Sequence, residues 1–341
     1  MFKLGFDCHK AFSQVAILDE KGAVVKECRL VNQRAALARF VRELAQPVQA
    51  VIEAGYNWGL MYDLLTELGV DVRVAHPLRV KAIASAQIKT DTIDARTLGR
   101  LLHARLIPEI YVPSPDIRRQ KDILRQRCWL VKMQTAVKNR IHQLLARNHI
   151  ENPGFTDLFG LGGMKFLRSL ALGTSDQQLL TQDLELYDLV HEQVKIITHW
   201  IGGVLQDNRY RTILLSLPGL GAVLAALAAL EIAAINRFTS PGKLTAYAGL
   251  VPTTYASGGK VHHGDLLPQC NRYLRYAFVE AAWSAVKSSP YCRALFAKLR
   301  KRKGANTAII VVARRLCGIA YLCLKENRLY EERAYDYDHR V

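Results

Sequence analysis

The 341-residue sequence is short of acids relative to bases, and it lacks patterned cysteines and an uninterrupted membrane-length apolar run. Asp and Glu number 30 against 47 Lys and Arg, which gives a formal charge of +17. A charge of that sign attracts polyanions, so nucleic acid or an anionic membrane surface is the expected partner. The 50 % hydrophobic content excludes a largely disordered chain.

The seven cysteines form no C-x-x-C pair and have no regular spacing, which argues against a zinc knuckle or a disulfide framework. Residues 1–7 run directly into a strand pattern without an apolar signal segment, so we expect a cytoplasmic protein. The longest uncharged run, residues 212–230, contains Pro218 and Gly219, which would break a spanning helix. We therefore predict that this run forms core, and we expect no membrane partner.

Residues 1–112 alternate between strand and helix patterns. The pattern predicts strands over 3–7, 14–18, 23–30, 48–52 and 70–75, and helices over 33–45, 58–68 and after Pro77. Asp7 and Glu53 stand where two of these strands end, and ligands of open sheets collect at strand ends.

Two further acids, Asp91 and Asp94, lie three residues apart at the start of a helical pattern that Thr90 can cap. This spacing places both carboxylates on one helix face. Taken alone, the pair is equally typical of surface acids that stabilise a helix N-terminus.

The acids belong to segments that resemble a known family. Three segments of the chain are similar, in order, to the three acidic motifs of one transposase family, namely GFDCHK, VIEAGYNWG and KTDTIDARTLGRLL. This family is the DEDD transposases of bacterial insertion sequences, which are bridge-RNA-guided serine recombinases. The strand and helix order also resembles the ribonuclease H fold of Holliday-junction resolvases. The resemblance implies an acidic tetrad that binds Mg²⁺, in a two-metal site, through Asp7, Glu53, Asp91 and Asp94.

Two long helices are predicted over residues 118–148 and 176–205, separated by a glycine-rich, irregular stretch over 154–173. The first carries nine Lys or Arg against a single acid, Asp122. The pair is consistent with either a structural spacer or a coiled-coil arm that joins subunits and binds nucleic acid. We predict domains over 1–112 (α/β, catalytic), 113–207 (helical arm) and 208–326 (mainly α), with a polar tail over 327–341.

The predicted third domain opens with Pro-Gly-Leu-Gly at 218–221, which resembles a helix-hairpin-helix turn. Further on, YASGGKVHHG has the composition of a flexible loop, and the resemblance places the family's nucleophilic serine at Ser257. The following LLPQCNRYLR keeps Asn271 and Arg275 of the family pattern but lacks one lysine and one glycine.

A second basic stretch, residues 293–315, carries eight Lys or Arg and no acid. We expect the two stretches and the serine loop to contact nucleic-acid backbones, although solvated helix faces have the same composition. The candidate residues are Arg118, Arg119, Lys121, Arg125, Arg127, Lys132, Lys138, Arg140, Lys260, Arg275, Lys298, Arg300, Lys301, Arg302 and Lys303.

The resemblance implies an insertion-sequence transposase that exchanges donor and target DNA strands through a serine–phosphate intermediate. It further implies guidance by a structured bridge RNA and a homo-oligomer, from dimer to tetramer. Two alternatives stay open at this stage. One is a metal-dependent junction resolvase or nuclease that hydrolyses DNA without a covalent intermediate, and the other is a non-catalytic nucleic-acid scaffold.

Overall fold

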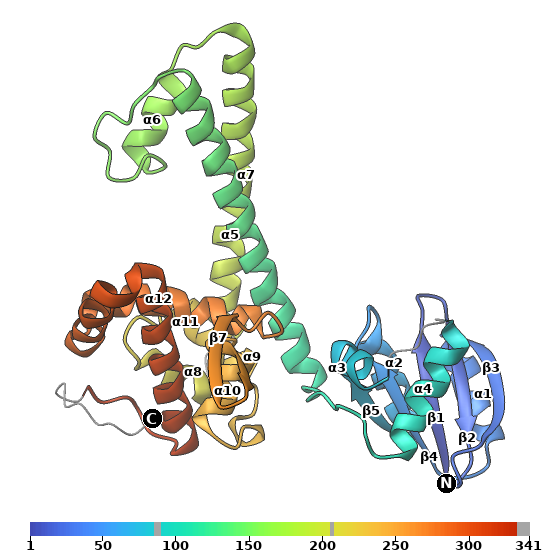
Figure 1. The fold of residues 1–341 in the computed structure, drawn as a ribbon. Helices are drawn as coiled ribbons and strands as arrows, with labels where there is room; N and C mark the ends of the chain where they lie inside the picture. Colours follow the sequence, from blue (N-terminus) through green and yellow to red (C-terminus); the bar gives the residue numbers. More distant parts are fainter. Residues whose placement is uncertain (85–89, 205–207, 333–341) are drawn as a thin grey trace. The chain divides into compact units, whose positions relative to one another are not determined.

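The computed structural model of the chain describes residues 1–84, 90–204 and 208–332 (Figure 1). The chain divides into two compact units, Met1–Val112 and Pro113–Val341. The predicted domains 113–207, 208–326 and 327–341 all fall in the second unit. Parts of three predictions lie outside the described residues, namely Lys89 of the third acidic motif, residues 205–207 of the arm, and residues 333–341 of the polar tail.

The first unit is built on a mixed five-stranded sheet with the strand order β3-β2-β1-β4-β5. Its elements are β1 (Phe2–Cys8), β2 (Phe12–Leu18), β3 (Val24–Val31), α1 (Arg34–Glu43), β4 (Val48–Glu53), α2 (Trp58–Glu67), β5 (Asp71–Ala75), α3 (Pro77–Ile83) and α4 (Asp91–His103). Strand β1 pairs antiparallel with β2 and parallel with β4. The predicted order of strands and helices is confirmed, and the sheet is compatible with the ribonuclease H-like prediction.

The two faces of this sheet are covered by different helices because successive strand residues point to opposite faces. On one face, Phe6 belongs to a buried cluster with Leu37 of α1 and Met61 of α2. On the other face, Val51 belongs to a cluster with Leu98 of α4. Helix α4 therefore covers the face opposite to α1 and α2.

The second unit begins with a helical hairpin, the arm, formed by α5 (Pro115–Arg147) and α7 (Thr174–Val204). The helices run antiparallel, since Arg127 contacts Thr198 while Arg140 contacts Asp183. The prediction of two long helices is confirmed. At one end, the arm shares a buried cluster with α6 (Leu161–Ser169), and at the other end it joins the core cluster that contains α9.

Helix α6 corrects the prediction of an irregular glycine-rich stretch. Gly160 stands at its N-cap position, and Met164 and Leu167 are buried against the arm. A Cβ atom at Gly163 would lie 2.1 Å from the carbonyl oxygen of Leu158. The glycines here permit close packing of a short helix, which composition alone did not distinguish from a loop.

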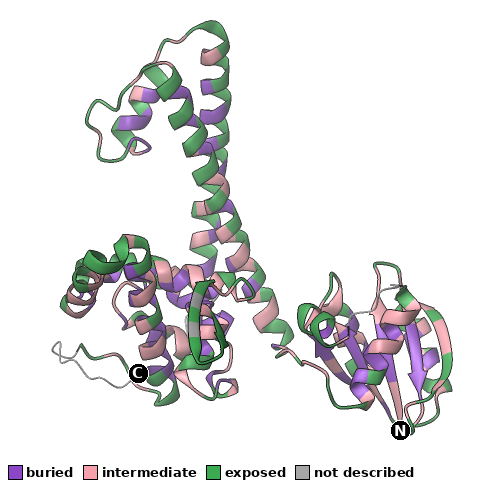
Figure 2. Ribbon diagram, viewed as in Figure 1, coloured by how far each residue is buried: buried purple, intermediate pink, exposed green. Residues whose placement is uncertain are grey.

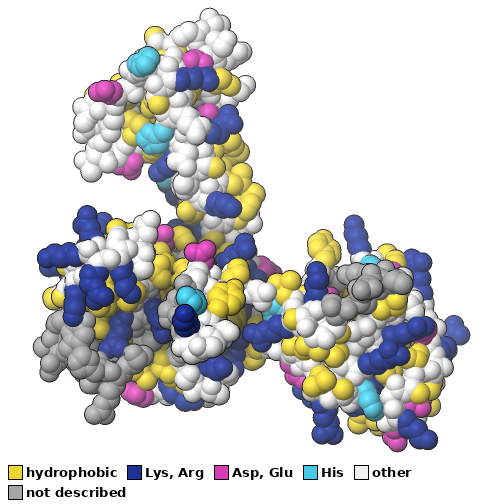
Figure 3. Space-filling view, viewed as in Figure 1, with side chains coloured by type: hydrophobic (Ala, Val, Ile, Leu, Met, Phe, Trp, Pro, Cys, Tyr) yellow, Lys and Arg dark blue, Asp and Glu magenta, His cyan; other side chains and the backbone are white. Residues whose placement is uncertain are grey.

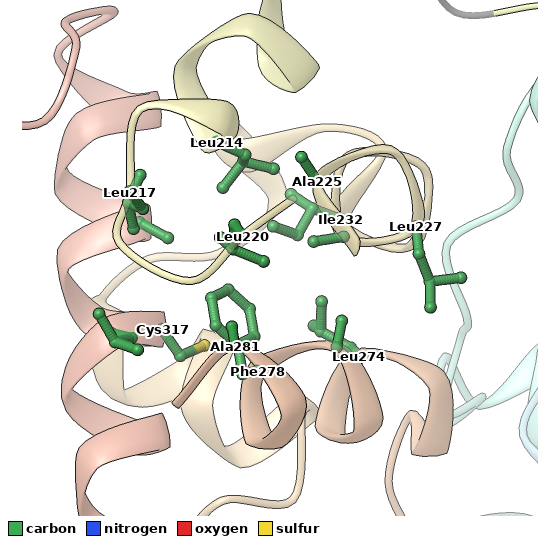
Figure 4. Close-up of a cluster of buried hydrophobic side chains, with 14 of the residues drawn as sticks. Leu214, Leu217, Leu220, Ala225, Leu227, Ile232, Leu274, Phe278, Ala281 and Cys317 are labelled. Carbon is green, nitrogen blue, oxygen red and sulfur yellow. The ribbon is translucent and has the colours of Figure 1, made fainter. Parts of the chain in front are cut away.

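The rest of the second unit is a mainly helical core with one β-hairpin. Its elements are α8 (Arg209–Leu215), α9 (Ala222–Ile232), the 3₁₀ turn Ile235–Arg237, α10 (Pro241–Tyr247), β6 (Pro252–Ser257), β7 (Lys260–Leu266), α11 (Arg272–Ser288) and α12 (Pro290–Lys325). Helix α9 is buried along most of its length, and Figure 2 colours the described residues by burial. The predicted turn at residues 218–221 connects α8 to α9 and lies over α11, where a Cβ at Gly219 would come 2.0 Å from the Ala281 carbonyl oxygen. Around that turn, Leu217 and Leu220 face Phe278 in the core (Figure 4).

Helix α12 combines a basic first half with an apolar second half, and it breaks at Gly304, whose φ is 76°. By length and composition it is the one helix among the described residues that is long and apolar enough to cross a membrane. However, 56 % of its most apolar 18-residue stretch is buried inside the unit, where Val312 and Leu316 belong to the core cluster. A buried core helix accounts for this composition.

Candidate metal centre and nucleic-acid surfaces

The start of α4 fixes the positions of Asp91 and Asp94. Thr90 caps the helix, its hydroxyl oxygen accepting a hydrogen bond from the backbone N–H of Ile93 at 3.2 Å. Asp91 and Asp94 both lie in the first turn, where the helix dipole favours negative charge. The cap and the one-face placement of the acids follow the prediction from sequence.

The parallel pairing of β1 with β4 sets Asp7 beside Glu53. Phe6 is in register with Ile52, so the next residue of each strand stands at the same end of the sheet. Asp7 lies two residues after Gly5, whose missing Cβ lets the backbone of α4 approach, because a Cβ there would lie 2.0 Å from Ala95 O. Strand alternation therefore places Asp7, and Glu53 with it, on the α4 face of the sheet.

A residue that sequence reasoning missed, His9, lies between two of the acids. Its Nε2 atom is 3.0 Å from Oδ2 of Asp91 and 3.3 Å from Oδ2 of Asp7, yet it makes no hydrogen bond of good geometry with either. The ligand atoms of these three residues all lie within 4.8 Å of one another. The signal in the sequence was a second ligand type, histidine, two residues after the acid at the same strand end.

Two asparagines from distant parts of the first unit hold the backbone of His9. The side-chain amides of Asn32 and Asn57 donate to its carbonyl oxygen at 2.7 and 2.9 Å. The imidazole ring lies 4.7 Å from the ring of Phe12, measured between centroids. The histidine is therefore positioned from β2, from the loop before α1 and from the loop before α2.

The group of Asp7, His9 and Asp91 fits a divalent cation. Two carboxylate oxygens and one imidazole nitrogen converge, and the nitrogen lacks a hydrogen-bond partner that would compete with a metal. Oxygen ligands suit Mg²⁺ and Mn²⁺, and the imidazole adds affinity for transition metals. Glu53 and Asp94 are not members of this 4.8 Å group, although register and helix phase place them at the same sheet edge.

Ser257 lies in the second unit on a β-hairpin, and this corrects the prediction of a flexible loop in that place. Strands β6 and β7 pair antiparallel, with Ser257 opposite Lys260, and both side chains are exposed. Gly258 and Gly259 have φ values of 56° and 75°, which two-residue hairpin turns require. The signal for the hairpin in the sequence was the Gly-Gly pair between two segments that contain β-branched residues.

Two protein-family models match the chain, and both describe transposases. A family model described as Transposase, for the DEDD transposases of IS110, matches residues 4–150. A second model, described as Transposase IS116/IS110/IS902 family, matches residues 211–297, and together the two cover more than half of the chain. The chain belongs to the IS110 family of insertion-sequence transposases. It is thus a DNA-transposing enzyme, and its DEDD family implies a DNA substrate and a divalent metal.

Several curated proteins are similar to this transposase. The putative transposase y4qE of Sinorhizobium fredii is 24 % identical over 288 residues, which are 82 % of this chain and 71 % of the relative. The transposase for insertion sequence element IS1111A of Coxiella burnetii is 24 % identical over 343 residues, with 96 % and 90 % covered. The insertion element IS110 uncharacterized 43.6 kDa protein of Streptomyces coelicolor is 30 % identical over 146 residues, with 42 % and 36 % covered.

Some cations of the transposase that we expected to contact nucleic acid are engaged within the protein. Lys121 is buried, and its ammonium lies 3.4 Å from the fully buried carboxylate of Glu231. Arg125 donates to both oxygens of Glu231 at 2.8 and 3.1 Å, and Asn271 donates to the same group at 2.8 Å. Arg275 donates to the carbonyl oxygen of Leu267. These contacts join the arm, α9 and α11, so Lys121, Arg125 and Arg275 have partners within the protein, and their contact with nucleic acid stays a prediction.

The protonation of Glu231 follows from this network. Burial alone would raise the pKa of its carboxyl group, but the hydrogen bonds from Arg125 and the charge of Lys121 outweigh burial and lower the pKa below its usual value. The signal for this group in the sequence was a single acid at the end of a long uncharged run. An acid in such a place needs a buried cation as a partner.

Other candidate cations are exposed or only partly engaged. In the arm, Arg119 pairs with Asp116, Arg140 pairs with Asp183, and the ammonium of Lys138 lies 4.8 Å from the ring centre of Phe159. In α12, five candidates are exposed immediately before the break at Gly304, namely Lys298, Arg300, Lys301, Arg302 and Lys303. Lys and Arg side chains gather over this part of the helix in Figure 3. We define residues 298–303 as the α12 basic run.

Proposed function

We propose that this transposase is an RNA-guided DNA recombinase, which cleaves and exchanges donor and target strands in the cytosol under the direction of a structured bridge RNA. The observation that carries the proposal is the convergence of Asp7, His9 and Asp91 at the sheet edge where α4 begins. The first unit acts in this proposal as a ribonuclease H-like catalytic domain. Base pairing by the RNA selects the DNA sequence, and basic protein surfaces hold the backbones.

In the first unit, the acids Asp7, Glu53, Asp91 and Asp94 hold Mg²⁺, with His9 as an additional ligand or positioning group. When bound, a pair of Mg²⁺ ions supplies Lewis-acid activation of the attacking and leaving oxygens of phosphoryl transfer. The sheet and the capped helix keep the carboxylates in place, and Asn32 and Asn57 keep His9 directed at them. Strand exchange then depends on this edge of the sheet.

In the second unit, Ser257 supplies the nucleophile. Its Oγ forms a bond to phosphorus, the bond from phosphorus to one strand end breaks, and that end leaves as a hydroxyl. The serine phosphodiester conserves the energy of the broken bond, so that the hydroxyl of a new strand can displace Ser257 and close the exchange without an outside energy source. Lys260, which pairs with Ser257 across the hairpin, supplies positive charge near the phosphate.

The oligomeric state and the domain roles belong to the same proposal. Exchange between two DNA molecules needs several active subunits, and we propose a homo-oligomer that reaches a tetramer. The arm, residues 113–207, joins subunits, and the third domain, residues 208–326, presents Ser257 and the α12 basic run to nucleic acid.

The decisive experiment looks for the covalent link. Protein, the RNA that co-purifies with it and a nicked DNA substrate are incubated with Mg²⁺, stopped with detergent and separated on a denaturing gel. We expect a DNA-bound protein band that Ser257→Ala abolishes and that Ser288→Ala, which changes an exposed helix serine, retains. A band that persists in Ser257→Ala would overturn the role of the serine, and free hydrolysed ends without a band would favour a resolvase-like nuclease.

RNA guidance is tested separately by sequencing the co-purified RNA and changing its target-pairing segment. The proposal expects the insertion site to move with the new complementarity. An insertion site that stays fixed would overturn RNA guidance while leaving the metal site and Ser257 in place.

A further inference from the structure

A row of side chains leads from the candidate metal centre towards the outer edge of the sheet in the first unit. His9 lies between Asp7 and Asp91, with which it forms the acidic site. The centre of the Phe12 ring lies 4.7 Å from that of the His9 ring, and the guanidinium carbon of Arg29 lies 3.4 Å from the centre of the same Phe12 ring. The row therefore ends in a cation that belongs to neither of the two basic stretches of the sequence.

Strand register places Arg29 on the same face of the sheet as Asp7. Asp7 of β1 is in register with Gln14 of β2, and Gln14 is in register with Arg29 of β3. Residues directly opposite each other in antiparallel strands share a face, so all three side chains lie on the α4 face. Two strand spacings separate Asp7 from Arg29, which is about 10 Å between their backbones.

The charge of Arg29 is not neutralised within the described part of the chain. Its side chain is exposed, and none of the ion pairs among the described residues involves it. Glu27, two residues earlier on the same strand face, accepts a hydrogen bond from Arg96 of α4 at 2.6 Å. Strand β3 is the outer strand of the sheet (Figure 1), so Arg29 presents its charge at the sheet edge.

The stacked arrangement of Arg29 suits it to bind a phosphate. Stacking on a ring holds a guanidinium group flat and leaves the N–H donors at its rim directed outward. These donors match the oxygens of a phosphate, to which an arginine donates two parallel hydrogen bonds. A nucleic-acid strand carries one negative charge per about 3.4 Å of its axis, so a strand with one phosphate at the acidic site can bring another to Arg29.

We propose that Arg29, held by Phe12, binds a phosphate of the DNA strand that lies at the acidic site, about one to three nucleotides from the phosphate placed there. The inference rests on the proposed function, because it takes DNA as the ligand of the acidic site, and it adds a residue that orients the strand. Its tests measure binding, so they do not require Ser257 to react. DNA binding with the expected role of Arg29 but without strand exchange would overturn the proposed function and leave the inference standing, and strand exchange without that role would do the reverse.

The first test counts the phosphates that Arg29 binds. Full-length protein with its co-purified RNA is titrated with the nicked DNA substrate over a salt series, with Ca²⁺ in place of Mg²⁺ so that the DNA stays uncut. We expect Arg29→Gln to lower the slope of log K against log salt by roughly 0.7 to 0.9, which is the share of one phosphate. Arg29→Lys should keep the slope, because a lysine also neutralises a phosphate, but should bind more weakly without the two parallel hydrogen bonds.

The matched control is Lys26, an exposed cation on the same strand. It is in register with Ile17, which is buried with the α1 and α2 side of the sheet, so Lys26 lies on the face opposite to Arg29. Lys26→Gln removes the same charge and should leave the slope unchanged. A slope that Arg29→Gln does not alter, or that Lys26→Gln lowers equally, overturns the proposal.

A purely structural role for Arg29 is the alternative, since an arginine on an aromatic ring also stabilises neighbouring strands. Mn²⁺ affinity without DNA, measured by calorimetry, separates the two roles. Arg29 lies two strands from Asp7 and is not a metal ligand in the proposal, so Arg29→Gln should keep the metal affinity of the unmodified protein. A loss of metal affinity together with the lower slope would mean that the variant distorts the acidic site, and it would overturn the direct contact.

The second test locates the phosphate. Each phosphate that flanks the cleaved bond of the nicked substrate is replaced in turn by a neutral methylphosphonate, and binding is measured as in the first test. One replacement within about three nucleotides of that bond should weaken binding by the unmodified protein about tenfold and leave binding by Arg29→Gln nearly unchanged, because the variant has already lost the contact. Equal sensitivity of the two proteins at every position overturns the proposal. If the protein cuts no DNA, the proposed function fails, and the salt slopes alone decide the role of Arg29.

Discussion

The proposed reaction needs the acidic site of the first unit and the serine hairpin of the second unit. The structure builds these two sites in opposite ways. At the edge of the first unit, side chains from β1, α4 and the loop after β1 converge within 4.8 Å, and asparagines from two other segments support them. On the hairpin of the second unit, Ser257 is exposed next to a Gly-Gly turn. The hairpin is fixed at its base, where Leu267 N–H donates to Val251 O at 3.1 Å.

This contrast matches the physical demands of the two tasks. Carboxylates repel one another and converge only if the fold holds them there, so a metal centre requires a rigid frame. A nucleophile that attacks a large, rigid substrate instead requires access. The fold therefore places its regular structure around the acids and leaves the serine at the tip of a short hairpin.

Removing one carboxylate from the acidic site of the first unit should produce the largest effect, a loss of strand-exchange activity. We expect Asp91→Asn to lower metal-dependent strand exchange by at least about a thousandfold, because in the proposed function this carboxylate holds the catalytic metal. The melting temperature should hold or rise, since one of two neighbouring negative charges is removed. Gel assays of exchanged products and calorimetric melting check both parts.

The control for that change is Asp116→Asn, which alters an acid in the first turn of α5 that pairs with Arg119. It removes the same charge from the same kind of helix position without touching the sheet edge. Equal losses of activity in the two variants would contradict the metal-centre assignment.

Local patterns in the sequence were sufficient for the first unit. Strand alternation, the Thr90 cap and the spacing of Asp91 and Asp94 predicted the element order and the helix face that carries the acids. The role of His9 was not predictable in the same way, because its orientation depends on Asn32 and Asn57, which lie far from it in the sequence.

In the second unit, the pattern of charges along the sequence did not predict which basic side chains are buried. A run of basic residues on one helix predicts a nucleic-acid surface, but Lys121 and Arg125 turn inward to Glu231, which lies more than 100 residues later in the chain. Tertiary pairing of this kind leaves no local signal on the basic residues themselves. The visible signal was on the acid, at the end of an apolar helix.

Breaking that buried network should give the second largest effect, this time on stability. Glu231→Gln leaves the partly buried Arg125 and the buried Lys121 without a counter-charge, which costs about 3 to 5 kcal/mol of unfolding free energy. Urea denaturation at neutral pH measures the loss. Asp183→Asn, which breaks the pair with the exposed Arg140 elsewhere on the arm, should cost less.

The stability lost in Glu231→Gln should also depend on pH. The folded protein lowers the pKa of Glu231 below its usual value of 4.5, so the carboxylate contributes stability above about pH 4.5. That contribution is lost as the pH falls through the lowered pKa of the folded state. The stability difference between the unmodified protein and Glu231→Gln should therefore shrink as the pH falls below 4.5, and a constant difference would contradict the assigned charge.

Close packing behind the acids can be tested with a single methyl group. A Cβ at Gly5 would lie 2.0 Å from Ala95 O, so Gly5→Ala forces α4 away from β1 and should cost about 1 to 3 kcal/mol. Because α4 carries Asp91, the affinity for Mn²⁺, measured by calorimetry, should fall as well. Gly69→Ala is the control, since it introduces backbone strain in the same unit where no atom would meet the new Cβ; an equal loss of metal affinity there would refute the packing argument.

The smallest expected effect is on the salt dependence of nucleic-acid binding, when exposed cations of the α12 basic run are neutralised. Each phosphate that the α12 basic run no longer binds should lower the slope of log K against log salt by roughly 0.7 to 0.9. Neutralising Arg300, Lys301 and Arg302 to Gln should therefore lower the slope by about 2 to 3 for a nucleic acid that binds all three side chains. The melting temperature should change little because the three side chains are exposed.

The control for the basic run is Arg39→Gln, which removes an exposed arginine that pairs with Glu43 on α1 and should leave the slope unchanged. Filter-binding titrations over a salt series measure both slopes. A slope that does not change when the basic run is neutralised would mean that its charges are solvated and that the nucleic-acid surface lies elsewhere.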